Sequence, residues 1–433
     1  MSHTPNLLLK NVRPVGTDYD GSEQLDVRIT DGNISEIGSG LHPKENEETH
    51  DAEGAYLSGG WMDMHVHLRE PGYEHKETIK TGCASAAFGG FTEVACMPNT
   101  SPAIDSRDVV EFIKKEADPL PVEVHPIGCV SKERAGDSIA EMGDMQKGGA
   151  VAFSDDGDPV SNSQLMRVAL EYSSMLDMPI INHEEDLKLS RPGHMHEGSV
   201  SARLGLDGTP GIAEEVMIAR DILLAKFTGG HIHVAHISTA KAVDLVRQAK
   251  ADGVNITTEV CPHHFDLTDE EIERRDFDTN VKMHPPLRSQ EDVDATIEGL
   301  ADGTIDAICT DHAPHAIQEK EVEFMYAPNG IIGLETAWPV SVRQLLKPGI
   351  LDLQALLDKL IINPREILGL DIPKIKEGAV ANLTLFNTDQ KWTYKEAVVK
   401  SKSANSPYLG DELVGRAEAI YNKGQFVVNE LST

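Results

Sequence analysis

The sequence predicts an α/β protein, namely a (β/α)8 barrel of the TIM type with a small β-sandwich domain built from both chain ends. Two observations predict the barrel: eight short apolar or β-rich runs occur in order, and helix-like stretches lie between most of them. Repeated alternation of strands and helices is typical of parallel strands that close into a barrel. The third observation is that both ends of the chain are β-rich, which predicts the smaller domain.

The predicted barrel strands are short apolar runs, and we assign them to residues 59–370. They cover residues 61–67, 91–97, 122–130, 150–154, 179–183, 231–236, 255–261 and 305–311. Three intervening stretches, 109–116, 213–227 and 239–249, are predicted helices. Ser238 or Thr239 can cap the third of them, because a hydroxyl accepts a hydrogen bond from the free backbone N–H groups of the first turn.

The two chain ends share a β-rich pattern. The runs lie at 7–12 and 25–30 near the N-terminus, and at 381–386, 419–421 and 426–428 near the C-terminus. Asp31-Gly32 after the second run is a hairpin turn signal. We therefore predict that residues 1–58 and 371–433 form the two parts of one β domain.

Composition indicates a soluble globular protein rather than a membrane or nucleic-acid-binding protein. The 433 residues are 40% hydrophobic and 25% charged, and no apolar run approaches the roughly 20 residues of a membrane span. The N-terminus has no secretory pattern, so we expect a cytoplasmic location. The net charge of −32 disfavours nucleic acid and anionic membranes as partners. It also favours a high-salt cytoplasm, where screening reduces self-repulsion; an ordinary acidic surface is the alternative.

The five cysteines are scattered and mostly lie in apolar stretches. They are Cys83, Cys96, Cys129, Cys261 and Cys309. We expect them to be small buried hydrophobic residues rather than disulfides or metal ligands. The chain has no CxxC pair that would indicate a zinc–thiolate site.

Histidines and aspartates recur where the predicted strands end. His65 and His67 are two apart, so in a strand they point to one face, while Val66 and Leu68 point to the other. Asp155-Asp156, His183, His236 and Asp311 follow or end four other runs. A single histidine of this kind is more often structural. Six metal-competent groups at matching strand ends, where barrel active sites lie, predict a metal centre.

The pattern also suggests which of these groups bind each metal ion and which one transfers protons. One ion can be held by His65, His67 and Asp311, a second by His183 and His236, with a carboxylate between them. Paired ions can activate water and polarise a carbonyl. Asp311 can then carry a proton to a leaving nitrogen as a general acid-base.

The chain resembles the amidohydrolase superfamily and, more specifically, the type I dihydroorotases. The matching segments are Asp63–Gly72, Met97–Thr100, Phe153–Gly157 and Thr310–His315 with Lys320. His-x-His is common to the superfamily, whereas Met-Pro-Asn-Thr together with Asp-His-Ala-Pro-His is far more specific. The resemblance implies reversible cyclisation of N-carbamoyl-L-aspartate to dihydroorotate and water, a step of pyrimidine synthesis, with one or two Zn²⁺ ions per subunit.

The resemblance also implies roles for individual residues. The implied metal ligands are His65, His67, Asp156, His183, His236 and Asp311. Asp156 is the bridging carboxylate, where many relatives have a carboxylated lysine, and Asp311 is also the catalytic acid-base. The implied substrate-binding residues are His67, Arg69, Asn99, His284, His315, Asn329 and Gly330. A guanidinium, an amide and an imidazole suit a carboxylate ligand.

Two positions depart from the family pattern. His284 stands where the family usually has Asn, and Asn329 stands where it usually has Phe; both changes concern fine substrate contacts more than the reaction. Residues 316–330 are polar and end in Pro328-Asn329-Gly330. We expect a lid that closes over substrate, with a rigid loop as the alternative.

Two other functions remain open from the sequence. A hydantoinase or allantoinase is the nearest alternative, but neither needs the carboxylate clamp of Arg69, Asn99 and His315. A non-catalytic scaffold for aspartate carbamoyltransferase is the second, although scaffolds of this type usually lose metal ligands. A homodimer, and an active enzyme that also binds the transferase, are implied by the resemblance alone.

Overall fold

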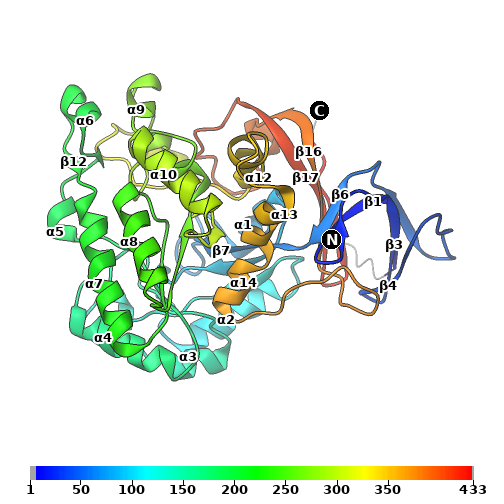
Figure 1. Ribbon diagram of the computed structural model, residues 1–433, viewed down its shortest axis with the longest axis horizontal. Coiled ribbons are helices and arrows are strands. Elements are labelled where there is room, and N and C mark those ends of the chain that lie inside the picture. Colours follow the sequence, from blue (N-terminus) through cyan, green and yellow to red (C-terminus); the bar gives the residue numbers. More distant parts are fainter. Residues whose placement is uncertain (1–5, 432–433) are drawn as a thin grey trace.

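The computed structural model describes residues 6–431. A barrel surrounded by helices is joined to a β-rich region, and both chain ends lie on the side of that region (Figure 1). Among residues 6–431, no helix is long and apolar enough to cross a membrane.

The barrel is built from parallel strands. They are β7 (Trp61–Val66), β8 (Phe91–Cys96), β9 (Glu123–Pro126), β10 (Ile180–Asn182), β13 (Ile232–Val234), β14 (Ile256–Val260) and β15 (Ala307–Ile308). They form two ribbons, β7–β8–β9 and β10–β13–β14–β15. Parallel bridges of Phe153 to Gly128 and Ile180, and of His312 to Val66, join the ribbons into a ring. The predicted (β/α)8 barrel is thus confirmed.

Two predicted strands are shorter than expected. The run 150–154 forms β-bridges only at Phe153, although the N–H groups of Val151, Phe153 and Ser154 all donate to carbonyls of the flanking segments. The run 305–311 pairs as β15 only at Ala307–Ile308. Here the N–H of Thr310 donates to the carboxylate of Asp63, at 3.1–3.2 Å, instead of to a neighbouring strand. A side-chain acceptor therefore replaces the backbone ladder at Thr310.

Helices cover the outside of the barrel. The longer ones are α1 (Ile79–Gly89), α2 (Arg107–Ala117), α3 (Met142–Gly148), α4 (Ser163–Ser174), α7 (Ile212–Thr228), α8 (Ala240–Ala251), α10 (Gln290–Ala301) and α13 (Leu353–Ile361). The shorter ones are α5 (Leu187–Ser190), α6 (Ser199–Leu204), α9 (Glu271–Arg274), α11 (Ile317–Lys320), α12 (Ala337–Ser341) and α14 (Asn363–Leu368). All three predicted helices are present as α2, α7 and α8. Thr239 caps α8 and accepts a hydrogen bond from Ala242 N–H at 3.1 Å.

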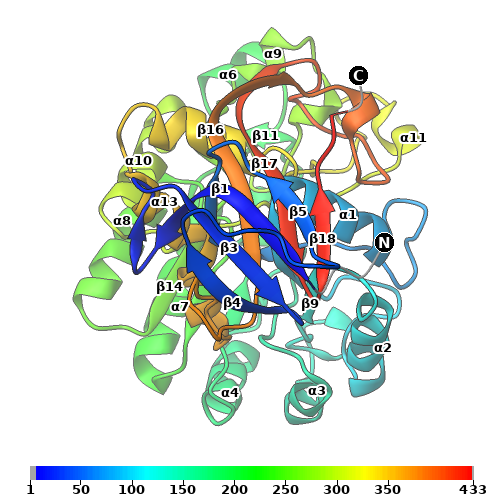
Figure 2. The same cartoon turned by 90° about the vertical axis from the view of Figure 1, so that its right-hand side faces the viewer.

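Strands from both chain ends form one sheet, as predicted. Seven of its strands are β1 (Leu7–Gly16), β3 (Leu25–Thr30), β4 (Asn33–Gly38), β6 (Tyr56–Gly59), β16 (Leu383–Thr393), β17 (Glu412–Asn422) and β18 (Gln425–Val428), in the order β18-β17-β16-β6-β1-β3-β4. Two short strands, β2 (Tyr19–Asp20) and β5 (Glu48–Asp51), also pair with β1. Figure 2 shows the blue N-terminal strands beside the orange and red C-terminal ones. Asp31 and Gly32 both have positive φ and form the predicted β3–β4 hairpin. The domain boundaries at residues 58 and 371 stay a prediction.

The apolar core has separate layers. One cluster fills the inside of the barrel and includes Met62, Met64, Ala95 and Ile181. A larger cluster, to which Val66 and Leu68 belong, lies between the strands and the surrounding helices. Val66 and Leu68 therefore point away from the barrel axis, as the alternation around His65 and His67 predicts.

Candidate active site

A cavity of about 230 Å³ lies at the carboxyl ends of the barrel strands. Its walls come from loops after seven different barrel segments, and they are lined by His67, Arg69, Asn99, Asp156, Gly157, His183, His236, His284, Asp311, Ala313, His315, Asn329 and Gly330. Every residue that the sequence analysis assigned to the site lines this cavity except His65, which lies fully buried against Asp156 and Asp311. Residues up to 265 positions apart thus form one site.

The carboxylate of Asp156 lies between two pairs of histidines. Its Oδ2 is 3.5 Å from Nε2 of both His65 and His67. Its Oδ1 is 3.6 Å from Nδ1 of His183 and 3.5 Å from Nε2 of His236. Asp156 thus lies within 3.6 Å of a ring nitrogen of each of the four histidines.

The donor atoms fit a metal centre. Nε2 of His65 and Oδ1 of Asp156 are buried without hydrogen-bond partners, and Nδ1 of His183 lies 2.9 Å from Nε2 of His236. Three sets of potential ligand atoms lie within 4.8 Å of one another in this site: His65, His67 and Asp311; His65, Asp156 and His236; and His183, Glu185 and His284. Burial alone would raise the pKa of Asp156, but the nearby histidines hold it well below its usual value. Asp156 is therefore a carboxylate available to bind a cation.

Outer hydrogen bonds fix the orientation of the first two histidines. Nδ1 of His65 donates to the buried carboxylate of Glu259, and Nδ1 of His67 donates to Oδ1 of Asn99 at 2.8 Å. Both bonds direct Nε2 of the ring towards Asp156 and Asp311, and an outer hydrogen bond at the other ring nitrogen is usual for ligating histidines. The sequence analysis missed Glu259, although a single acidic residue inside an apolar strand could have indicated a role in the site.

Asp311 is held in a strained conformation beside His67. Its Oδ1 lies 2.9 Å from Nε2 of His67. Asp311, Arg69 and His236 all have positive φ, at 46°, 62° and 31°, a region that non-glycine residues seldom adopt and that clusters at functional sites. The preceding residue, Thr310, is fixed by the buried Asp63, whose pKa is raised by burial to about 7.

The structure separates the two aspartates of the Asp155-Asp156 pair. Asp155 accepts hydrogen bonds from the backbone N–H groups of Val130 and Ser131, both at 3.0 Å, so it anchors the loop after β9. Asp156 alone lines the cavity. The sequence spacing did not decide whether Asp155 or Asp156 is the metal ligand. The choice of Asp156 came from the family resemblance.

A second group of polar residues lies across the cavity from the histidine cluster. Nε of Arg69 donates to the carbonyl of Pro314 at 3.2 Å, which leaves its two Nη groups available for a ligand. Nε2 of His315 donates to the carbonyl of Asn329 at 2.8 Å. Burial beside Arg69 lowers the pKa of His315 to about 2, so this imidazole is neutral.

Asn405 organises this wall from the C-terminal part of the chain. Its Nδ2 donates to the carbonyls of Ala313 and Gly330, both at 3.1 Å, and its Oδ1 accepts from the N–H of His315 at 3.1 Å. It thereby joins the segment that carries His315 to the segment that carries Gly330. Asn405 was not predicted, and a single amide in a polar loop gives no sequence signal for this role.

The segment 316–330 covers one side of the cavity. Its buried Lys320 donates through Nζ to the carbonyls of Thr279 at 3.1 Å and Pro328 at 2.9 Å. Lys282 donates to the carbonyls of Phe324 and Met325. These bonds hold the segment against the barrel, so that Asn329 and Gly330 reach the cavity.

The fold and the site define a cyclic amide hydrolase of the amidohydrolase superfamily, with a candidate metal centre. The comparisons then give the particular family. The family model described as dihydro-orotase-like matches residues 54–242. The chain is 50% identical to a dihydroorotase of Geobacter sp. strain M21 over 98% of this chain and 99% of that protein. It is 47% identical to a dihydroorotase of Syntrophus aciditrophicus with the same coverage. The chain therefore belongs to the dihydroorotase family.

Solved structures with the same fold include hydantoinases. The L-hydantoinase (dihydropyrimidinase) of Arthrobacter aurescens has a TM-score of 0.86 at 24% identity, with 99% of this chain and 97% of that chain covered. The dihydropyrimidinase of Brevibacillus agri has a TM-score of 0.82 at 21% identity, covering 98% and 95%. At this identity the likeness extends to the fold.

Proposed function

We propose that this protein catalyses the reversible cyclisation of N-carbamoyl-L-aspartate to dihydroorotate and water, in pyrimidine synthesis. One observation carries the proposal. The same cavity joins a cluster of metal-competent histidines and aspartates to the guanidinium of Arg69 and the amide of Asn99, two donors that suit a carboxylate, with His315 beside them. Dihydroorotate presents both features to such a cavity, a ring amide and a carboxylate.

We propose Zn²⁺ as the cofactor, with one or two ions per subunit. His65, His67, Asp156, His183, His236 and Asp311 are the proposed ligands, a set of imidazoles and carboxylates that zinc accepts. When bound, the metal supplies Lewis-acid polarisation of the amide carbonyl and activation of water.

Asp311 is the proposed proton carrier. Burial would raise the pKa of its carboxyl group, but the hydrogen bond with His67 and the charge of His65 hold it well below its usual range. Asp311 therefore begins hydrolysis as a carboxylate that accepts a proton at Oδ, and it delivers that proton to the ring nitrogen that leaves. In cyclisation the same steps run in reverse.

The remaining residues bind and orient the substrate. The free Nη groups of Arg69 and the Nδ2 of Asn99 donate to the substrate carboxylate. His67, His284, His315, Asn329 and Gly330 surround the ring. Holding the amide against Asp311 in this way converts proton transfer into a step between fixed partners, which is the main effect of positioning.

The test is turnover of dihydroorotate by the purified chain, measured with zinc and with a chelator. We expect turnover that the chelator abolishes and zinc restores, with little turnover of hydantoin or allantoin. A preference for hydantoin or allantoin would contradict the proposal and favour the nearest alternative.

The proposal extends to assembly and location. It places the enzyme in the cytoplasm as a homodimer that also associates with aspartate carbamoyltransferase. Size-exclusion chromatography with light scattering, with and without the transferase, measures both associations. If turnover appears only when the transferase is present, the partner is required; if the transferase binds a chain that stays inactive, the scaffold alternative holds.

A further inference from the structure

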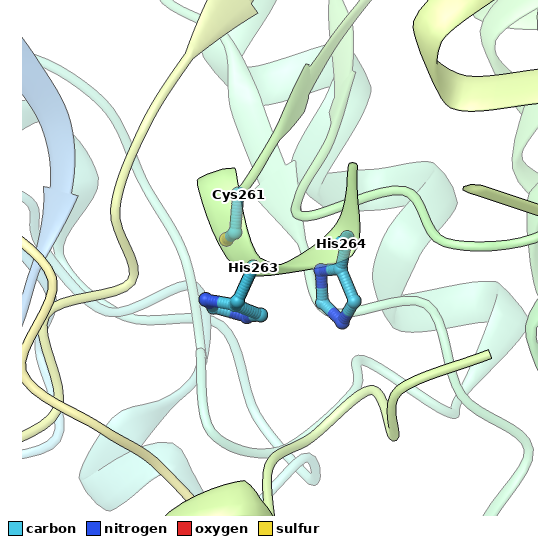
Figure 3. A group of neighbouring side chains, drawn as sticks. All are labelled: Cys261, His263 and His264. Atoms are coloured by element: carbon cyan, nitrogen blue, oxygen red, sulfur yellow. The ribbon is translucent and has the colours of Figure 1, made fainter. Parts of the chain in front are cut away.

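A second cluster of metal-competent side chains lies outside the proposed ligand set. Cys261, His263 and His264 are 0%, 2% and 3% exposed. One potential ligand atom from each lies within 4.8 Å of the others. Figure 3 shows the three side chains projecting from one short turn of the chain.

The turn that carries these residues is fixed on all sides. It follows β14 and forms a 3-10 helix over Pro262–His264. The N–H of His264 donates to the carbonyl of Cys261 at 2.9 Å, and that of Leu267 donates to the carbonyl of His263 at 3.0 Å. Nε2 of His264 donates to the carbonyl of Pro285 at 3.0 Å. The three side chains are thus held together by the backbone rather than by flexible loops.

One ring atom in this cluster has no partner. Nδ1 of His264 is buried and makes no hydrogen bond. Because Nε2 carries the proton that bonds to Pro285, Nδ1 is left with a lone pair. Figure 3 shows one nitrogen of this ring on the side that faces Cys261 and His263. The two imidazole rings lie against each other, with centroids 4.3 Å apart. A buried acceptor without a donor is unfavourable, so this geometry points to a missing ligand.

We propose that Sγ of Cys261, a ring nitrogen of His263 and Nδ1 of His264 bind a zinc-like metal ion. One thiolate and two imidazoles are donors that zinc accepts, and three protein ligands leave a fourth position for water or another small ligand. Both rings are available as neutral donors, because burial lowers the pKa of His263 to about 4 and that of His264 well below its usual value. Binding would form the metal–sulfur bond and release the thiol proton to solvent.

This site changes the expected role of Cys261. From the sequence we expected all five cysteines to be buried packing residues, and all five are indeed buried and free. Among residues 6–431, however, Cys261 is the one cysteine found in a group of metal-competent side chains. The six ligands proposed for the catalytic centre contain no sulfur. A thiolate ligand would therefore distinguish a metal ion in this second site from one in the catalytic centre.

Cobalt substitution of the full-length protein tests the proposal. Co²⁺ bound by a thiolate absorbs in the near ultraviolet through sulfur-to-metal charge transfer, whereas Co²⁺ bound by histidine and carboxylate ligands does not. We expect this band in the wild-type chain and in Cys83→Ser, a matched variant at another buried cysteine, and its loss in Cys261→Ser. Zinc content by mass spectrometry should fall by one ion per chain in Cys261→Ser and in His264→Gln.

The outcomes separate this site from the catalytic centre. A fully cobalt-loaded wild-type protein without the charge-transfer band would overturn the proposal, and this measurement requires no variant to fold. Equal zinc content in wild type, Cys261→Ser and His264→Gln would also overturn it. Neither readout depends on turnover, so failure of the proposed dihydroorotase activity would leave this test intact.

Discussion

Oε1 of Glu185 accepts a hydrogen bond from Nε2 of His284 at 2.8 Å, while its Oε2 lies 3.6 Å from Nε2 of His183. Glu185 therefore joins the proposed substrate residue His284 to the proposed metal ligand His183. Burial alone would raise the pKa of Glu185, but the nearby His183 and His284 hold it far below its usual value. The sequence analysis missed this residue, although an acid two positions after His183 was a signal.

Substitution of Glu185 should weaken metal binding at His183. Glu185→Ala leaves the His183 ring without its outer partner, and removal of such a partner typically costs about 10- to 100-fold in metal affinity. Chelator competition measures this change. The matched control is Glu184→Gln, because Glu184 is buried next in sequence but bonds to Asn182 and does not line the cavity. Equal affinities in both variants would contradict the role of Glu185.

Asp311→Asn should abolish turnover with little effect on the fold. An amide cannot accept and return the proton, and general acid-base catalysis contributes about 100- to 10,000-fold. Steady-state kinetics measures the loss, while circular dichroism and metal content report whether the fold and the site persist. Near-normal turnover by a folded, metal-loaded variant would refute the role of Asp311.

The sequence predicted those site residues whose place in the fold follows from a local pattern. Apolar runs locate the barrel strands, and the C-terminal ends of parallel strands meet at one face, so His65, His183 and His236 converge by topology. Substrate-wall residues such as Arg69 and Asn99 were assigned through the family motifs. The structure brings both groups into one cavity, while their individual roles stay predictions.

What the sequence did not predict depends on contacts between distant segments. Glu259 supports His65 across 194 positions, and Asn405 binds His315 across 90 positions. No local spacing identifies such partners.

A buried charge network should determine part of the acid stability. Glu93 accepts hydrogen bonds from Arg365 and Asn382, each at 2.8 Å, and from His125 at 2.8 Å. Burial would raise its pKa, but His125 and Arg365 lower it from 4.5 to about 2. A carboxyl group with a lowered folded-state pKa stabilises the protein above pH 4.5, and this stabilisation, about 3 kcal/mol, is lost as the pH falls towards 2.

The variant Glu93→Gln tests that network. It leaves the buried Arg365 without a counter-charge, so we expect a loss of about 3–5 kcal/mol in the free energy of unfolding at pH 7, measured by urea denaturation. The difference from wild type should shrink between pH 4.5 and 2. Glu111→Gln, at an exposed ion pair with Arg107, should have little effect. A difference that stays constant with pH would contradict the assigned pKa.

Ligand binding should protect the segment 316–330 from proteolysis. Tyr326, near its tip, is 74% exposed, whereas Lys320 is buried and tied to Thr279 and Pro328. Limited proteolysis with chymotrypsin should therefore cut near Tyr326, more slowly with dihydroorotate and faster in Lys320→Met. Equal rates in all three samples would favour a rigid loop over a lid.

Potassium chloride should stabilise the protein. The 71 acidic and 39 basic residues give a net charge of −32, so like charges repel across the folded surface. Salt shortens the screening length from about 10 Å at 0.1 M to about 3 Å at 1 M, which weakens that repulsion, while buried pairs such as Arg365–Glu93 are screened much less. Thermal unfolding should shift to higher temperature across this range. Glu298 is exposed on α10, and within residues 6–431 it forms no ion pair. Glu298→Lys reduces the magnitude of the net charge by two, so this variant should unfold at higher temperature in low salt and gain less from added salt. A melting temperature that falls with KCl, or a variant with the same salt response as wild type, would refute the high-salt interpretation of the acidic composition.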